Sequence, residues 1–216
     1  FPAKAYRVGS REAGSVFEPM VVKLEAFAIR ATETTVAEYC LYLNSSNAVL
    51  KDGHPQIGEE EDRHIPLPGK ELEPVGWVSY ADAADYCAWL SEREAALVRL
   101  PSEYEWEAAA HGGIAGSRYP WGWGDPAGRT HYAKESASRV GMYRPNPAGL
   151  FDMAGNLFEW CLPDKAAAGT APVRGGSWAE KDARFLRIYW NTMIDRDYRG
   201  ADVGFRPVKL SQYEEQ

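Results

Sequence analysis

Cysteine and histidine are the side chains best suited to hold a transition metal or to act as nucleophile and base, and this chain has few of them. They are Cys40, Cys87, Cys161, His54, His64, His111 and His131. No CxxC pair or other metal-ligand spacing joins them, and no HExxH, nucleophile elbow or Gly-rich phosphate loop occurs. Cys40 and Cys87 fall in apolar helical patterns, which predicts small buried thiols. The residue types and spacing therefore favour neither a metal centre nor a nucleophile.

Carboxylate pairs are the second feature that could do chemistry. Glu103 and Glu107 are four residues apart, so on a helix they share one face. We expect that face to be solvated rather than catalytic. Asp152 follows Arg144 closely in the sequence, and we expect a structural salt bridge between these two.

Glu159 is a different kind of carboxylate, because it stands between two aromatic residues in "GNLFEW". Burying it without hydrogen-bond donors would be costly. Arginines are candidate partners, since a guanidinium group presents several donors in a fixed fork. The candidates are Arg174, Arg187 and Arg206. The pattern predicts a buried, hydrogen-bonded network rather than an active site.

The elements that must position these residues follow from capping signals and periodicity. A strand is predicted over residues 18–30, and helices over 31–46, 78–94 and 99–113. The helix start signals are Thr34 or Thr35, Ser79 with Asp82, and Ser102 with Glu105. Residues 44–75 predict a long excursion, and no helix of ordinary length is expected after residue 113. No stretch has linker composition, so the pattern predicts one α+β domain over residues 1–216.

Composition limits the classes of partner. The formal charge is −7 and the pI is about 5.2, which argues against nucleic acid or an anionic membrane as the main partner. No run of 18 apolar residues occurs, so no membrane insertion is expected. The chain begins at Phe1 rather than Met, which favours a processed or trimmed product, and the sequence does not identify a compartment.

Several motifs occur in the order and at the spacing of one known family. They are "PVGWVSYADAADYCAWLS" (74–91), "RLPSEYEWEAAAHGG" (99–113), "YPWGWG" (119–124), "NPAGLFDMAGNLFEWC" (146–161), "VRGGSW" (173–178) and "GFRP" (204–207). Together they resemble the formylglycine-generating enzyme, or sulfatase-modifying factor, family over roughly residues 18–208. The resemblance implies an elaborated C-type-lectin-like fold with small twisted sheets, early helices and much irregular backbone.

The resemblance also raises an enzymatic activity that this sequence does not support. Formylglycine-generating enzymes hold copper with two cysteines that follow the "GGS" motif. Here that segment, "WAEKDARFL" from Trp178 to Leu186, contains no cysteine, and neither Glu180 nor Ala183 supplies the thiolate that Cu(I) prefers. Formylglycine synthesis is therefore not expected.

Two other branches of the family, and a non-enzymatic role, bear on the function of this chain. The sulfoxide synthases need a His-rich iron site on an additional domain, and the histidines here have no ligand spacing. A siderophore-maturation branch works without the cysteine pair, so a non-copper oxidoreductase remains the alternative to a binding function. A scaffold or regulatory domain is the third reading.

No catalytic residue, bound metal or other cofactor is expected, with one exception that the resemblance leaves open. Family members often hold structural calcium, and Asn156 could contribute an oxygen, the type of ligand that this cation prefers. His131 stands where the family often has Asn, so calcium remains open.

The chain is most similar to the variable proteins of diversity-generating retroelements, in which fixed positions build a scaffold and interspersed positions display a binding surface. The fixed pattern is matched by Arg174, Gly175, Gly176, Ser177, Trp178, Arg187, Asp197, Arg199, Gly204, Phe205 and Arg206. Within the resulting display segment, residues 178–203, the expected binding residues are Ala179, Glu180, Lys181, Asp182, Arg184, Trp190, Thr192, Met193, Ile194, Asp195, Tyr198 and Asp202.

The large residues within "YWNTMIDRDY" do not follow the spacing of a strand or a helix, so no single face of either element would bury them. We therefore expect a solvated loop there. Aromatic side chains are common binding anchors, which favours a non-catalytic protein that binds a protein ligand. Trp190, Met193, Ile194 and Tyr198 are expected to share one exposed patch beside residues 179–184. The family usually has Arg where Asn191 stands and Pro where Arg196 stands.

A display protein would be expected at a cell or virion surface, and the oligomeric state is not predicted.

Overall fold

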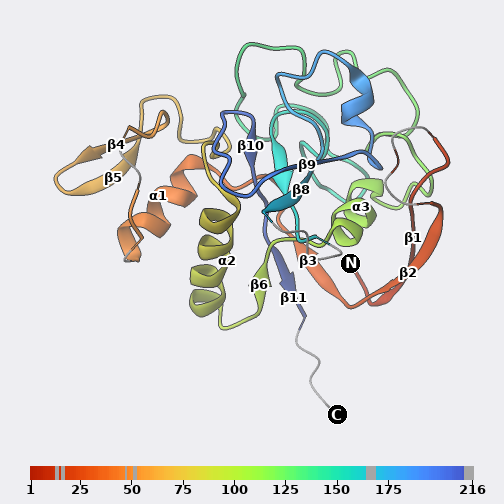
Figure 1. The fold of residues 1–216 in the computed structure, drawn as a ribbon, viewed down its shortest axis with the longest axis horizontal. Helices are drawn as coiled ribbons and strands as arrows, with labels where there is room; N and C mark the ends of the chain where they lie inside the picture. Colours follow the sequence, from red (N-terminus) through yellow and green to blue (C-terminus); the bar gives the residue numbers. More distant parts are fainter. Residues whose placement is uncertain (13–14, 16–17, 47, 51–52, 164–168, 212–216) are drawn as a thin grey trace.

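The computed structural model describes residues 1–12, 15, 18–46, 48–50, 53–163 and 169–211, and it has the α+β architecture expected from the sequence (Figure 1). In Figure 1 the first two helices lie toward one end of the molecule and the β1–β2 hairpin toward the other. Long irregular connections fill the space between the small sheets. No helix in the described residues is both long and apolar enough to cross a bilayer.

Three α-helices form where the capping signals predict them. They are α1 (Val36–Ser45), α2 (Tyr80–Glu94) and α3 (Glu103–His111). Each begins with a reciprocal capping box, formed by Thr35 with Glu38, by Ser79 with Asp82 and by Ser102 with Glu105. Such boxes satisfy backbone N–H groups that the first turn leaves without partners, so the start sites follow from local chemistry. After residue 113 the described chain contains only a short 3-10 helix, η1 (Ala183–Leu186).

The described strands form small sheets, most of them antiparallel. Two are hairpins, β1 (Lys4–Val8) with β2 (Met20–Leu24), and β4 (Ile57–Glu60) with β5 (Arg63–Pro66). A third has the order β3 (Phe27–Ile29), β11 (Val208–Leu210), β6 (Val98–Arg99). The fourth has the order β10 (Val203–Gly204), β7 (Phe158–Trp160), β8 (Thr170–Arg174), β9 (Asn191–Asp195). In this sheet β10 runs parallel to β7, and β9 is the edge strand.

Several boundaries differ from the sequence-based expectations. The single strand expected over 18–30 is two strands, β2 and β3, which belong to different sheets. The excursion over 44–75 contains the β4–β5 hairpin. The solvated loop expected within residues 189–198 is wrong in part, because residues 191–195 pair with β8 as β9. Each difference arises from pairing between distant segments, which local periodicity does not encode.

The core consists of two main groups of side chains. One lies between α1, α2 and the β7–β8 pair and includes Trp160, and the other lies around α3 and includes Trp106. Both indoles are fully buried. The three cysteines are also buried and free, as expected for Cys40 and Cys87, and burial raises the pKa of the Cys40 thiol to about 11 and that of the Cys87 thiol to about 12.

Candidate functional site

The base of the candidate site is a buried ion pair. Arg206 donates through Nε and Nη2 to the two carboxylate oxygens of Glu159, each at 2.7 Å, and both side chains are fully buried. Trp106 Nε1 donates to the same carboxylate at 2.7 Å. The network predicted for Glu159 is therefore present, and Arg206 is its partner among the three candidate arginines. This pair joins β7 to the chain that follows β10.

A second buried pair corrects an expectation. Glu103 and Glu107 are not on a solvated face; they are 5% and 0% exposed. Arg174 lies 3.4 Å from the Glu103 carboxylate and 2.5 Å from that of Glu107. The helix α3 is covered by β8 through Arg174 and by the N-terminal segment, where Gly9 N donates to Glu107. Arg187, the third candidate, lies 3.6 Å from Glu12 instead.

Asn156 joins Glu33, before α1, to the loop that carries Ser138. Its amide nitrogen donates to Glu33 at 2.8 Å, and its amide oxygen accepts from Ser138 N at 3.0 Å. These two bonds engage both ends of the amide with protein groups. The residue is also fully buried and has a left-handed backbone. Across the described ranges, no group of three or more His, Cys, Asp or Glu side chains is placed to hold a metal ion.

Two further carboxylates lie near this point, Glu33, which is fully buried, and Asp152, which is half-buried. Glu33 also accepts from Leu157 N at 2.9 Å, and its pKa is raised well above the usual value, by burial first and then by the charges of Asp152 and Glu159. Asp152 accepts from Gly141 N at 2.6 Å. The salt bridge expected between Asp152 and Arg144 is not among the ion pairs of the described residues.

The first part of the display segment is fixed through its main chain. Trp178 N donates to Asn156 O at 2.7 Å. The neighbouring loop pairs alongside, since Lys134 N donates to Trp178 O and Ala133 N donates to Glu180 O, both at 2.9 Å. These bonds use backbone atoms only. The path of residues 178–180 therefore does not depend on the side chains at positions 179 and 180.

The second part, residues 196–202, is fixed against the start of α2. Trp77 N donates to Gly200 O at 2.7 Å, and Tyr80 N donates to Arg196 O at 3.0 Å. Arg199 forms an ion pair with Asp82, one of the capping residues of α2. Arg199 belongs to the fixed pattern, and its side chain has an anchoring contact that matches this assignment.

Side chains from the two parts meet at one surface, which we call the acidic face and define as Glu180, Asp182, Tyr198 and Asp202. The Tyr198 hydroxyl donates to Asp202 at 3.0 Å. The pKa of Glu180 is raised, by partial burial first and then by the charges of Asp202 and Asp182. Three acids therefore lie within electrostatic reach of one another. Tyr198 is 43% exposed, so the face combines negative charge with an accessible aromatic ring.

The remaining predicted binding residues lie apart from the acidic face or at its edge. Ala179, Lys181, Arg184 and Asp195 are exposed, and Thr192 is half-buried in β9. Arg184 pairs with Asp182, whose carboxylate caps η1. Trp190 is half-buried, and its ring packs edge-on against that of Phe185 with centroids 5.0 Å apart.

The expectation of one exposed patch for four large residues is wrong. Met193 and Ile194 are consecutive in β9, so their side chains point to opposite faces of the sheet. Met193 is 45% exposed, whereas Ile194 packs against the core. Trp190 pairs with Ser15 through an isolated bridge. Tyr198 alone of the four belongs to the acidic face.

Asn191 and Arg196, the two residues that differ from the family pattern, each contact a neighbouring group. Asn191 Nδ2 donates to Glu103 at 2.5 Å, and Arg196 Nε donates to Thr170 O at 2.9 Å. The guanidinium of Arg196 also lies over the Tyr80 ring, 4.9 Å from its centroid. The two residues therefore fix β9 and the turn that follows it, by contacts suited to amide and guanidinium groups.

Trp77 borders the candidate site and was not predicted as part of it. It is 37% exposed, has a left-handed backbone with φ of 58° and contacts Gly200 through its main chain. In the sequence, the available signal for Trp77 was a tryptophan placed just before a helix start signal. Its place beside residues 196–202 comes from tertiary structure alone.

The residues present do not fit copper(I). The three thiols lie in α1, in α2 and just after β7, and none is in the display segment. Burial raises the pKa of the Cys161 thiol well above its usual value, as it does for Cys40 and Cys87. A copper(I) site requires cysteine side chains in the thiolate form. Burial disfavours that form in all three cysteines of this chain.

Comparison with known proteins gives sequence relatives of several kinds. The chain is 37% identical over 115 residues to a serine/threonine-protein kinase, pkn1, of Chlamydia pneumoniae, covering 53% of this chain and 18% of the relative. It is 32% identical over 174 residues to the formylglycine-generating enzyme of Streptomyces coelicolor, covering 65% of this chain and 54% of that enzyme. The chain thus spans well under two thirds of the length of these relatives.

Solved structures match over almost the whole chain. Treponema denticola variable protein 1 aligns with a TM-score of 0.79 at 22% identity, covering 98% of this chain and 94% of the other. PvdO from Pseudomonas aeruginosa aligns with a TM-score of 0.78 at 25% identity, covering 97% of this chain and 92% of the other. The sulfatase-modifying factor enzyme 1-like domain family matches residues 6–210. The chain therefore belongs to the sulfatase-modifying factor, or formylglycine-generating enzyme, family.

Proposed function

We propose that this chain is a non-catalytic binding module that recognises a protein partner through the acidic face. The observation that carries the proposal is that, within residues 178–203, the main chain is fixed while many side chains are free to vary. The main chain is held by backbone hydrogen bonds at Trp178, Glu180 and Gly200, while side chains between these anchors reach solvent. Such a surface tolerates a change of side chain without a change of fold. The likeness of fold to a variable protein agrees with this division.

The chemistry of the face defines the partner. Glu180 has a raised pKa because burial and nearby acids disfavour its charge, so a cation placed there would relieve repulsion. Tyrosine adds a rigid, amphipathic contact of the kind enriched at interface hot spots. We therefore expect a protein with a basic patch that contains an exposed Lys or Arg.

The binding test uses a face variant and a matched control. The face variant is Glu180→Gln, Tyr198→Ser and Asp202→Asn, and the control is Glu59→Gln, Glu60→Gln and Trp123→Ser, which removes the same charge and one exposed ring elsewhere. Each protein is immobilised and exposed to protein from the organism that makes it, and captured material is quantified by mass spectrometry. A partner retained by wild type and control, and lost by the face variant, supports the proposal. Equal retention by all three contradicts it.

The second candidate is a non-copper oxidoreductase of the siderophore-maturation type. It is favoured by the match to PvdO over nearly the full length of this chain. Oxygen uptake with siderophore precursors, and separately with a cysteine-containing peptide after incubation with Cu(I), distinguishes the candidates. The binding proposal predicts no uptake above buffer and no stoichiometric copper. Turnover with either substrate, or about one tightly held copper per chain, would overturn it.

A further inference from the structure

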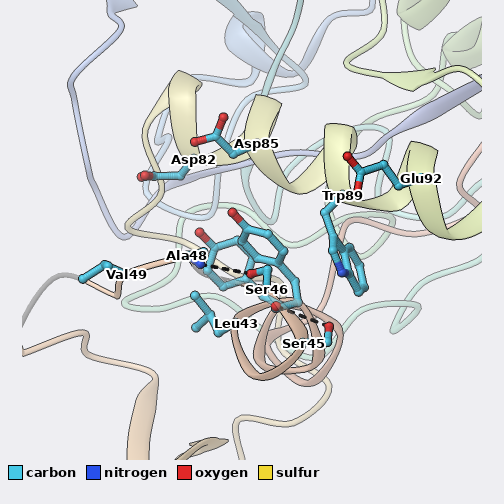
Figure 2. A pocket seen from close by; sticks show the side chains of 11 residues that line it. Leu43, Ser45, Ser46, Ala48, Val49, Asp82, Asp85, Trp89 and Glu92 are labelled. Atoms are coloured by element: carbon cyan, nitrogen blue, oxygen red, sulfur yellow. Dashed lines mark hydrogen bonds between the residues drawn. The ribbon is translucent and has the colours of Figure 1, made fainter.

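A separate feature of the molecule is a cleft of about 460 Å³ between α1 and α2 (Figure 2). Its α2 wall carries Asp82, Asp85, Trp89 and Glu92, which follow the helical spacing i, i+3, i+7 and i+10 and so share one face. Figure 2 shows the Trp89 ring extending from α2 toward α1, and Asp82, Asp85 and Glu92 placed along the same helix. None of these residues belongs to the acidic face.

The opposite wall comes from the C-terminal part of α1. Tyr39, Tyr42, Leu43, Ser45 and Ser46 line it. The last turn of α1 contains no basic residue, so the partial negative charge of the helix end is not offset by a side chain there. The rings of Tyr42 and Trp89 lie 5.4 Å apart and give the cleft an aromatic floor.

The lining has no cation of its own. Arg199 pairs with Asp82, and Arg93 lies over the Trp89 ring at 5.4 Å, but neither lines the cleft. Among the ion pairs of the described residues, none includes Asp85 or Glu92. These two carboxylates therefore contribute uncompensated negative charge.

A polar group also faces this space without a partner in the described chain. Tyr39 lines the cleft and is only 5% exposed, and its hydroxyl makes no hydrogen bond within the part of the chain that the structure describes. The hydroxyl oxygen itself is not fully buried, so a ligand or water in the cleft can reach it. A hydroxyl group can donate one hydrogen bond and accept others, so it can contact a ligand held there.

The spacing of charges defines the ligand. Asp85 and Glu92 are separated by seven residues of helix, which places them about 10 Å apart along the axis. One metal ion cannot bridge that distance, whereas two ammonium groups joined by an alkyl chain can. The chain between them would lie over Trp89 and Tyr42, and aromatic faces attract ammonium groups. We propose that this cleft is a binding site for a linear polyamine with terminal ammonium groups about 10 Å apart.

Calorimetric titration with spermidine tests the inference. The site variant is Asp85→Asn with Glu92→Gln, and the control is Glu59→Gln with Glu60→Gln, which removes the same charge from the β4–β5 hairpin. Asp82 is left unchanged because it caps α2. Charge-assisted hydrogen bonds predict a loss of about tenfold or more in the site variant and none in the control. Tyr39→Phe should weaken binding about threefold, since it removes one hydrogen bond to the ligand.

Other ligands test whether the cleft prefers a polyamine to other cations. Butylamine, with one ammonium group, should bind more weakly than spermidine by about tenfold, and Mg²⁺ should not displace spermidine. Equal binding to site variant and control would show attraction to net charge alone and would overturn the inference. Displacement by equimolar Mg²⁺, or tighter binding of a Lys-rich peptide, would do the same. The acidic-face variant should bind spermidine as wild type does, which keeps this test independent of the proposed function.

Discussion

Two carboxylates show how differently this molecule uses the same functional group. Glu107 is fully buried beside Arg174, and its pKa is lowered: burial would raise it, but the charge of Arg174 and the hydrogen bonds from His111, Gly9 and Arg174 together outweigh burial. Glu180 is half-buried on the acidic face, and its pKa is raised by burial and by neighbouring acids. The first carboxylate has a fixed partner within the chain, and the second has no ion-pair partner among the described residues. The buried pairs thus specify the scaffold, while the acidic face retains charge that an external partner can satisfy.

This comparison extends to the neighbouring residues. Arg174, Arg206 and Glu159 are fully buried, and the Arg206–Glu159 pair has a two-bond geometry that other side chains would not reproduce. The side chains of Tyr198 and Asp202 bond only to each other in the described chain, across a turn fixed by the main chain of Gly200. The difference predicts where substitution is tolerated.

The largest expected effect comes from breaking a buried pair. Replacing Arg206 by Met leaves the charge of Glu159 buried and unpaired, which should cost about 3–5 kcal/mol of unfolding free energy. Replacing Arg63 by Met is the matched control, since Arg63 is exposed on β5 and should change stability by less than about 0.5 kcal/mol. Urea denaturation measures both. Equal losses would abolish the distinction between scaffold and surface.

An intermediate effect is expected within β9. Ile194 packs against the core and Met193 does not, so Ile194→Ser should cost about 1–2 kcal/mol, roughly half the value for a fully buried site. Met193→Ser should remain within about 0.5 kcal/mol. Thermal melts of the two variants compare adjacent positions of one strand. Similar melting temperatures would mean that the two sides of β9 are equally exposed.

The smallest effect concerns pH. Because the folded pKa of Glu180 is raised above its usual 4.5, its contribution to stability is fully present below that value and is lost as pH rises through the folded pKa. Glu180→Gln should therefore stabilise the protein slightly above pH 4.5, by no more than about 0.5 kcal/mol. Glu107 has the opposite sign, since its lowered pKa gives stability that is lost as pH falls below 4.5. Urea melts across this pH range would contradict the account if Glu180→Gln were destabilising at neutral pH.

The sequence predicted the helices well because their start signals are local. Ser102 and Glu105, for example, are three residues apart and form their capping box without help from distant segments. The solvated face expected for Glu103 and Glu107 was wrong because Arg174, far along the chain, covers it. No periodicity within α3 reports that partner.

The candidate site shows the same limit. Motifs at both ends of the segment predicted that Trp190, Met193, Ile194 and Tyr198 would lie beside residues 179–184. Of these four, Tyr198 bonds to Asp202, whose charge reaches Glu180. The opposite orientations of Met193 and Ile194 depend on the pairing register of β9 with β8. An edge strand of five residues with half-buried sides gives no clear alternation, so its register could not be read from the sequence.

Saturation substitution of residues 174–206, with the folded fraction of every variant measured by protease resistance, tests the central claim most directly. The account predicts that Glu180, Tyr198 and Asp202 accept nearly all side chains, because the main chain is held by backbone bonds. It predicts that the buried Arg174 and Arg206 accept almost none. If positions of the acidic face proved as intolerant as these arginines, the face would be part of the scaffold, and the proposal that it displays a replaceable binding surface would be contradicted.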